Sequence, residues 1–287
     1  MGCCLIKNET PDDLKKYTTH ALKHNVNLSS PTTNIYTNKQ IVWKVCSGNK
    51  KSLSLTQTNN ERIKNLPASI FIAQPRQIIR MSPSKLAVSM RNFSPDLFTF
   101  MKTPFSTKKV FRGLEDIAQG IAWMHSHNLA HRDIKPENIV IGKHYKLIDF
   151  DFTSPLENYY RCGTEHYLVS QEIVNTWECD DIERSKRTDV FAFGKTIFAV
   201  LWFASSRRII SYNKVLKQCY FGNYCNPSCE NPFKGEAAHW FSIGVQCCLI
   251  QPPSCIPLTT NPDAIVTVSS FTIGADLEMV NADETFA

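Results

Sequence analysis

The sequence lacks several features that would assign it to a specialised class of protein. It has eleven cysteines, an odd number, and no paired C-x-x-C motif of the kind that holds zinc. No charged segment followed by an apolar stretch marks a secretion signal. The most apolar stretch, residues 190–204, contains Lys195 and is too short to cross a bilayer, so it predicts a buried helix. We therefore expect an intracellular protein of the cytoplasm or nucleus with reduced thiols. Metal binding at the one loose cysteine cluster is the alternative: Cys219, Cys225 and Cys229.

Lysine and arginine are absent after residue 258, where five acidic residues predict an acidic C-terminal tail. Residues 1–258 therefore carry a formal charge of +11, against +6 for the whole chain. Such a surplus suits nucleic acid, a membrane surface or an anionic ligand, and equally a solvated basic face. Because no basic motif with interleaved aromatic residues accompanies it, we expect no nucleic-acid partner.

The first four residues are Met1-Gly2-Cys3-Cys4. Myristoylation of Gly2 and palmitoylation of Cys3 and Cys4 would give the two-chain anchor that holds a protein at a membrane surface. The usual pattern has Ser or Thr at position six, where this chain has Ile6. A peripheral membrane contact and a coincidence of sequence both stay open.

The pattern of apolar residues changes after residue 96, and no internal repeat is evident. Before that point most apolar runs are short and rich in β-branched residues, which is typical of strands. Strands are expected at 41–45, 69–73, 77–80 and 85–90. Short helices are expected at 11–23 and 59–66, and turns at 28–38.

After residue 96 the spacing becomes helical. Residues 113–125 predict an amphipathic helix with one buried stripe. Two apolar runs, 139–141 and 146–148, flank a turn with Gly142 and predict a hairpin. We expect an α+β protein with two lobes and a tail. The predicted boundaries are 1–90 for a sheet-rich N-terminal lobe, 91–258 for a larger helical lobe and 259–287 for the acidic tail.

The string H-R-D-I-K-P-E-N occupies residues 131–138, and Asp149 follows the predicted hairpin. Phosphoryl transfer needs a carboxylate directed at the incoming hydroxyl, a positive group and oxygen ligands for a metal ion. Asp133 can accept the hydroxyl proton, and Lys135 can neutralise the transferred phosphoryl group. Asn138 and Asp149 can offer oxygen to Mg²⁺. We therefore predict that Asp133 and Lys135 are catalytic and that Asn138 and Asp149 bind the metal.

This string resembles the H-R-D-x-K-x-x-N loop of the eukaryotic protein kinases, and the resemblance covers about residues 40–258. It implies a bilobal kinase fold, ATP and Mg²⁺ as cofactors, and transfer of the γ-phosphate to proteins. In this family a lysine at the place of Lys135 accompanies serine/threonine specificity. The many departures from the family pattern resemble kinases carried by large DNA viruses.

Further segments of the helical lobe are similar to family motifs. Residues 189–194 resemble D-V-W-S-F-G, whose aspartate, here Asp189, holds the backbone of the catalytic loop. Gly163-Thr164 and Tyr167 resemble the substrate-docking loop, so Thr164 is expected to bond Asp133 and Lys135. Arg132 takes the place of the family's usual partner for an activation-loop phosphate. The available acceptors are Thr153, Ser154, Tyr159 and Tyr160.

The ATP-facing lobe departs from the family. No glycine lies between Gly2 and Gly48, so the glycine-rich loop over the phosphates is either rebuilt from residues such as 29–33 or missing. Lys44 is expected on the α- and β-phosphates. Glu61 is the only acidic residue between Val45 and Pro95, so the resemblance implies a Lys44–Glu61 pair and nucleotide contacts from both residues.

Two further motifs are altered. The metal-binding triplet reads Asp149-Phe150-Asp151, with Asp151 in place of glycine, and we expect a conformational cost at that residue. The A-P-E motif becomes residues 169–171, and Ile256 stands where its arginine partner would lie. Losing both charges of such a pair together can be nearly neutral for stability.

Two functions stay open on these grounds. An active, monomeric serine/threonine kinase acting on protein substrates is favoured because Asp133 sits in an intact string. A pseudokinase, acting as a nucleotide-binding or scaffold module, is favoured by the missing glycine loop.

Overall fold

The structure is a computed structural model, which describes residues 18–22, 32–93, 95–205 and 235–248. All of them belong to a unit that spans Met1–Pro252. Several predictions therefore lie outside the described residues: those on Gly2, Cys3 and Cys4, on the cysteine cluster, on residues 29–31 of the covering loop, on Ile256 and on the tail 259–287. The boundaries at 90 and 258 stay predictions.

Five antiparallel strands form the N-terminal sheet in the order β1-β2-β3-β5-β4. Alternate residues of β3 point to opposite faces, as the pleat of a strand requires. Ile41, Trp43 and Val45 pack with Ala87 on one face, while Cys46 packs with residues of α1 and β5 on the other. Lys44 lies on the same face as Cys46. The strands are β1 (Thr18–Leu22), β2 (Thr32–Thr37), β3 (Ile41–Ser47), β4 (Gln77–Ser82) and β5 (Lys85–Arg91).

Helix α1 (Lys50–Lys64) connects β3 to the rest of the sheet and packs against it. It begins at Asn49, whose side chain accepts a hydrogen bond from the backbone N–H of Ser52, a standard N-cap. Leu53 and Ile63 are fully buried. Leu55, the remaining large apolar residue of the helix, is exposed, so the position of the helix depends on these two apolar contacts and on its buried amides.

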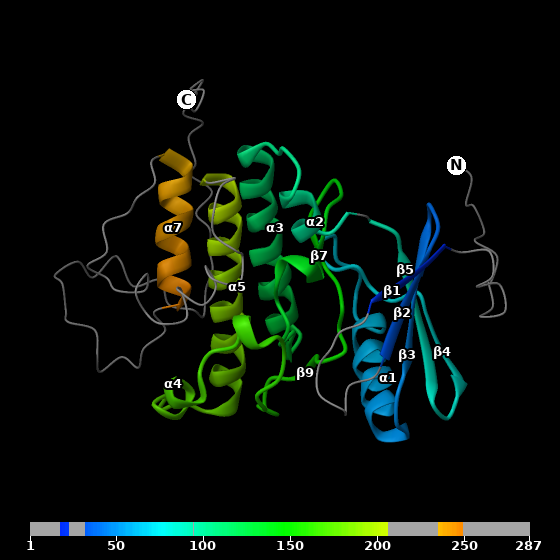
Figure 1. The fold of residues 1–287 in the computed structure, drawn as a ribbon. Coiled ribbons are helices and arrows are strands. Elements are labelled where there is room, and N and C mark those ends of the chain that lie inside the picture. Colours follow the sequence, from blue (N-terminus) through cyan, green and yellow to red (C-terminus); the bar gives the residue numbers. More distant parts are fainter. Residues whose placement is uncertain (1–17, 23–31, 94, 206–234, 249–287) are drawn as a thin grey trace. The chain divides into compact units, whose positions relative to one another are not determined.

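The C-terminal part is built mainly of helices (Figure 1). Helix α5 lies beside both α3 and α7, and its glycine at 194 allows the close approach of α7, since a Cβ there would meet the Cβ of Cys247 at 2.7 Å. The helices are α2 (Leu97–Met101), α3 (Thr107–Ser126), α4 (Gln171–Asn175), α5 (Asp181–Ser205) and α7 (Gly235–Cys248), with short 3₁₀ turns η2 (Pro136–Asn138) and η3 (Glu165–Tyr167). Two small ladders are β6 (Leu129–Ala130) with β9 (Ser154–Pro155), and β7 (Ile139–Val140) with β8 (Lys146–Leu147).

The predicted division into a sheet-rich N-terminal part and a helical C-terminal part is confirmed, as is the hairpin of β7 and β8. Three local predictions were wrong. The described part of 11–23 is strand β1, the described part of 28–38 contains strand β2, and 69–73 contributes only an isolated bridge between Ile72 and Leu147. Threonine-rich segments that look irregular alone become strands because neighbouring strands supply their hydrogen bonds.

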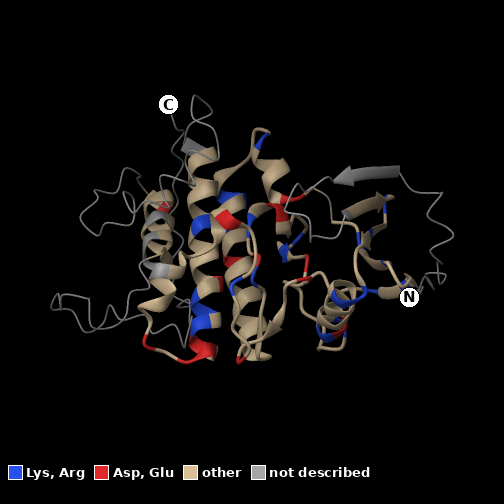
Figure 2. Ribbon diagram, turned by 60° about the horizontal axis from the view of Figure 1, so that its bottom comes forward, with Lys and Arg blue, Asp and Glu red and all other residues tan. Residues whose placement is uncertain are grey.

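Acidic and basic residues are interspersed along the helical part (Figure 2). On α5, Arg184 pairs with Asp181 and Arg187 pairs with Glu183 one turn apart, a spacing that favours such contacts. Within the described ranges no helix combines the length and apolar character needed to span a membrane.

Candidate active site

The loop of residues 131–138, the catalytic loop, is anchored to α5 by one buried carboxylate. Asp189 accepts hydrogen bonds from the backbone N–H groups of His131 and Arg132, both at 2.8 Å, and from Nε2 of His125 at 2.9 Å. Burial alone would raise the pKa of Asp189, but the hydrogen bond from His125, the neighbouring histidines and the backbone N–H of Arg132 hold it below its usual value. Arg132 adopts a left-handed backbone conformation, φ 71°, which the two anchored N–H groups keep in place.

Asp133 is 5 % exposed and receives hydrogen bonds at both carboxylate oxygens. Thr164 donates to Oδ1 from its backbone N–H at 2.9 Å and from its hydroxyl at 2.7 Å. Lys135 Nζ donates to Oδ2 at 2.8 Å and to the Thr164 hydroxyl at 2.6 Å. The contacts expected of Thr164 from the resemblance are therefore formed. A carboxylate fixed by so many donors has little freedom to turn away from an incoming hydroxyl.

Asn138 and Asp149 are brought to the same place by backbone bonds. The carbonyl of Ile148, next to Asp149, accepts from Nε2 of His131 at 3.0 Å, and the Ile148 N–H donates to the carbonyl of Asn138 at 3.0 Å. Phe150 is fully buried and its ring lies edge-on to His131, with centroids 5.5 Å apart. A backbone hydrogen bond thus joins Asn138 to the residue that precedes Asp149.

The donor set fits Mg²⁺. The amide nitrogen of Asn138 donates to the carbonyl and to the carboxylate of Asp133, both at 2.8 Å, so its amide oxygen is turned to the other side. Asp149 keeps 31 % of its side chain exposed, and its carboxylate can serve as an anionic ligand. Hard oxygen ligands from one amide and one carboxylate suit magnesium, which takes its remaining ligands from water and phosphate.

Lys44 reaches across from β3 to two carboxylates. Its Nζ donates to Oδ1 of Asp149 at 2.6 Å and to Oδ2 of Asp151 at 2.7 Å. Burial would lower the pKa of Lys44, but the two carboxylates raise it well above its usual value. Burial and the Lys44 charge act in opposite directions on Asp149, and the ammonium holds its pKa below the usual value. Burial and the charge of Asp149 raise the pKa of Asp151.

The predicted Lys44–Glu61 pair is wrong in this structure. Glu61 is exposed on α1 and accepts a hydrogen bond from Nε2 of Gln57 at 2.9 Å. The side chains that α1 turns to the site are the amides of Asn59 and Asn60, which are fully buried or nearly so. Glu61 lies one residue further along the helix, and a shift of one residue rotates a side chain by about 100° around the helix axis.

Asn59 and Asn60 are site residues that sequence reasoning missed, and it did not foresee the bond between Asp151 and Lys44. Asn59 Nδ2 donates to the backbone carbonyl of Asp151 at 2.7 Å, and Asn60 Nδ2 donates to its Oδ1 at 3.1 Å. The available signal in the sequence was a pair of adjacent asparagines within the helix expected at 59–66. The conformational cost expected at Asp151 is not seen, because the positive φ of 67° belongs to Asp149 instead.

Arg132 already has hydrogen-bond partners in the activation segment, the residues that follow Asp149. Its guanidinium donates to the backbone carbonyls of Tyr160 at 2.6 Å and Asn158 at 2.7 Å, and to the hydroxyl of Ser185 at 3.2 Å. The tyrosine ring of residue 160 stacks with it at 4.4 Å. Neutral backbone carbonyls therefore tie this segment to Arg132.

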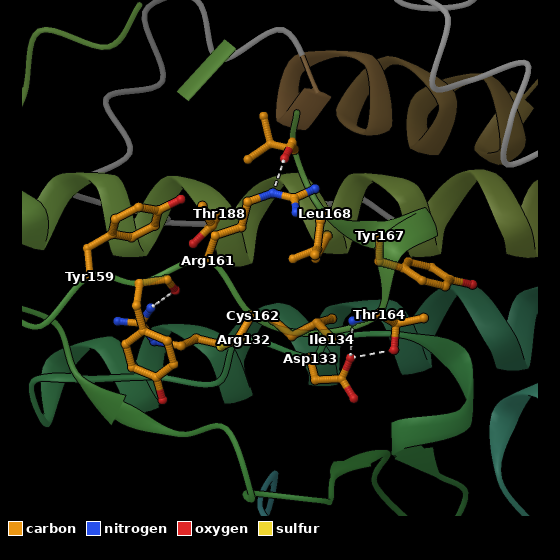
Figure 3. Close-up of a pocket in the computed structure, with 13 residues that line it drawn as sticks. Arg132, Asp133, Ile134, Tyr159, Arg161, Cys162, Thr164, Tyr167, Leu168 and Thr188 are labelled. Atoms are coloured by element: carbon orange, nitrogen blue, oxygen red, sulfur yellow. Dashed lines mark hydrogen bonds between the residues drawn. The ribbon is translucent and has the colours of Figure 1, made fainter. Parts of the chain in front are cut away.

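A small pocket opens beside Asp133 between the catalytic loop and residues 159–169 (Figure 3). Arg161 and Cys162 line it together with Leu168, and Arg161 Nε donates to the carbonyl of Val169 at 3.4 Å. Next in the chain, Ser170 caps α4, and Val169 packs in an apolar cluster with Trp177. In the described part of the altered A-P-E segment, apolar packing and a helix cap therefore hold the backbone.

The comparisons agree with this geometry. The model of the family described as "Protein kinase domain" matches residues 31–247. A putative serine/threonine-protein kinase of Acanthamoeba polyphaga mimivirus is 31 % identical over 120 residues, 40 % of this chain and 42 % of that protein. The cAMP-dependent protein kinase type 3 of Saccharomyces cerevisiae is 29 % identical over 128 residues, 42 % of this chain and 31 % of that protein. The matched segments thus cover less than half of these relatives.

Proposed function

Because the chain belongs to the protein kinase domain family, we propose that it transfers the γ-phosphate of ATP to serine or threonine hydroxyls of protein substrates. The observation that carries the proposal is the fixed carboxylate of Asp133, with Lys135 Nζ 2.8 Å from it and Thr164 bonded to both. A base and a cation held this close can act on one acceptor hydroxyl and the phosphoryl group it attacks.

The acceptor proton goes to Asp133. As the hydroxyl oxygen forms its bond to the γ-phosphorus, the bond from that phosphorus to the bridging oxygen breaks, and ADP leaves with the electron pair. Lys135 offsets negative charge on the transferred group, and Lys44 is placed to bind the other phosphates. Asn138 and Asp149 would hold Mg²⁺, which when bound neutralises phosphate charge.

The polypeptide substrate class is supported by the pocket beside Asp133. It lies next to the catalytic carboxylate rather than next to Lys44, and backbone from residues 159–169 lines it. Lys135, which the resemblance connects with serine/threonine specificity, contacts Thr164 at the edge of this pocket. A substrate chain bound along residues 159–169 would pass beside Asp133.

The proposal is tested with the full chain, Mg²⁺, γ-labelled ATP and a generic basic protein as acceptor. Asp133→Asn is expected to reduce label incorporation by about 100-fold or more, the usual worth of a general base. Asp181→Asn, at the exposed start of α5, serves as the control that keeps activity. Equal incorporation by the wild type and Asp133→Asn would refute the role of Asp133.

A nucleotide-binding pseudokinase is the second candidate. It is supported by the absence of glycine between Gly2 and Gly48 and by the two carboxylates that occupy Lys44. Nucleotide binding by the wild type without label transfer to any hydroxyl in the same assay would favour this function over the first.

A further inference from the structure

The lysine of β3 needs a carboxylate to hold its ammonium towards the nucleotide, and helix α1 does not supply one. Lys44 is 12 % exposed at its side chain, so an unpaired charge there would be costly. Glu61 faces solvent, and the residues of α1 that enter the site carry neutral amides. The negative charge must therefore come from another element.

Asp151 is held by hydrogen bonds to both carboxylate oxygens and to its backbone carbonyl. Its Oδ2 accepts from Lys44 at 2.7 Å and its Oδ1 from Asn60 at 3.1 Å, while Asn59 fixes its backbone carbonyl at 2.7 Å. Its side chain is 17 % exposed. Asn59 is itself oriented by Arg62, whose Nη1 donates to its Oδ1 at 2.9 Å. A carboxylate with both oxygens bonded and its backbone anchored is preorganised.

Asp149 cannot fill the same role alone. It also bonds Lys44, but it is more exposed than Asp151 and it is one of the two residues that suit Mg²⁺. If Asp149 turns to a metal ion, one of the two carboxylates is withdrawn from Lys44. Asp151, which is tied to α1 by the two asparagines, then keeps the ammonium paired.

We propose that Asp151 is the residue that positions Lys44 for the phosphates of the nucleotide, with Asn59 and Asn60 presenting it from α1. The carboxylate sits on the segment after Asp149 instead of on the helix, and the helix contributes amides that hold that segment. Only the kinetic consequence of this inference rests on the proposed function. The positioning of Lys44 is measured directly through nucleotide binding.

The test measures binding of a fluorescent ATP analogue to the full chain, with and without Mg²⁺. Asp151→Asn keeps the size of the side chain and removes its charge, so the Kd for the analogue should rise by about tenfold, the loss expected for one charged hydrogen bond. Glu61→Gln, the matched removal of a carboxylate on α1, should leave the Kd unchanged. Equal Kd values for wild type and Asp151→Asn, or equal weakening by Glu61→Gln, would overturn the proposal.

A double-mutant cycle distinguishes positioning from a general structural effect. If Asp151 acts through Lys44, the Asp151→Asn substitution should have no further effect on the Kd in a Lys44→Met background. A tenfold loss that persists in that background would contradict the proposal. The double variant Asp151→Asn/Asn60→Glu returns a carboxylate to α1 and should restore most of the affinity. The same double variant tests the proposal if Asp151→Asn alone folds poorly.

The kinetic readout separates this inference from the proposed function. Asp151→Asn should raise KM for ATP with a smaller change in kcat, whereas Asp133→Asn should lower kcat. Binding of the analogue that depends on Asp151, in a protein that transfers no phosphate, would end the proposed function and leave the role of Asp151 intact. Phosphate transfer by a protein whose KM for ATP is unchanged in Asp151→Asn would overturn the role of Asp151 and leave the proposed function intact.

Discussion

The two halves of the candidate site differ in how closely they follow the family pattern. Around Asp133 the loop, its threonine partner and the anchoring Asp189 are all present, and they make the contacts that the resemblance implies. Around Lys44 the glycines are absent, the helix offers asparagines, and the carboxylates come from Asp149 and Asp151. The groups that act on the acceptor need one geometry, because the reacting atoms fix it. A lysine partner has only to place a negative charge, which several elements of a fold can supply.

The comparison predicts different losses on the two sides. Substitutions on the sheet side should weaken nucleotide use, and substitutions on the loop side should weaken turnover or stability.

Lys44→Met should lower kcat/KM for ATP by about 100-fold or more, because a positive group that contacts phosphate is lost. Steady-state kinetics with varied ATP measure this. Lys85→Met, at the exposed start of β5, is the matched control on the same sheet. Because the change leaves Asp149 and Asp151 without their cation, the thermal stability of the variant should be measured alongside its kinetics. Unaltered kcat/KM would mean that another lysine contacts the phosphates.

Asp189→Asn should destabilise the helical part by about 2–3 kcal/mol, since a buried charged acceptor of two backbone N–H groups is replaced by an amide. Chemical unfolding monitored by circular dichroism measures the difference. The pKa of Asp189 is depressed in the folded state, so the contribution of its charge is complete above the unfolded value of about 3.9 and is lost as pH falls through the folded value. A difference between the two proteins that grows below pH about 4 would contradict this sign.

Thr164→Val should lower kcat by about tenfold, because the hydroxyl that bonds both Asp133 and Lys135 disappears. KM for ATP should stay the same, which would sharpen the contrast with Asp151→Asn. Thr176→Val removes a threonine hydroxyl from the C-terminal end of α4 and is the control. If KM rises instead of kcat falling, the two sides of the site are not separable in this way.

Phosphatase treatment of the purified chain should change its activity by less than about twofold, since the Nη atoms of Arg132 already bind the carbonyls of Asn158 and Tyr160. Activity is measured before and after treatment, with mass spectrometry to establish the phosphate content. A large loss on removing phosphate from Thr153, Ser154, Tyr159 or Tyr160 would show that Arg132 exchanges its partners.

Much of the loop side could be predicted from sequence. The spacing of Asp133, Lys135 and Asn138 within eight residues is local, so these side chains share a loop in any fold that forms it. Asp189 and Thr164 were found through family motifs. The two carbonyl partners of Arg132 could not be predicted, because backbone groups leave no mark on the sequence.

The sequence by itself determined which chemistry the chain can support: a carboxylate, a lysine, an amide and a second carboxylate in the order and spacing of phosphoryl transfer. It also determined the change from strands to helices, since periodicity is a property of neighbouring residues. Only the tertiary structure decided which acid pairs with Lys44. The lysine and Asp151 lie 107 positions apart, and the choice between Asp151 and Glu61 depends on the rotation of one helix against the sheet, which apolar contacts and two buried asparagines fix.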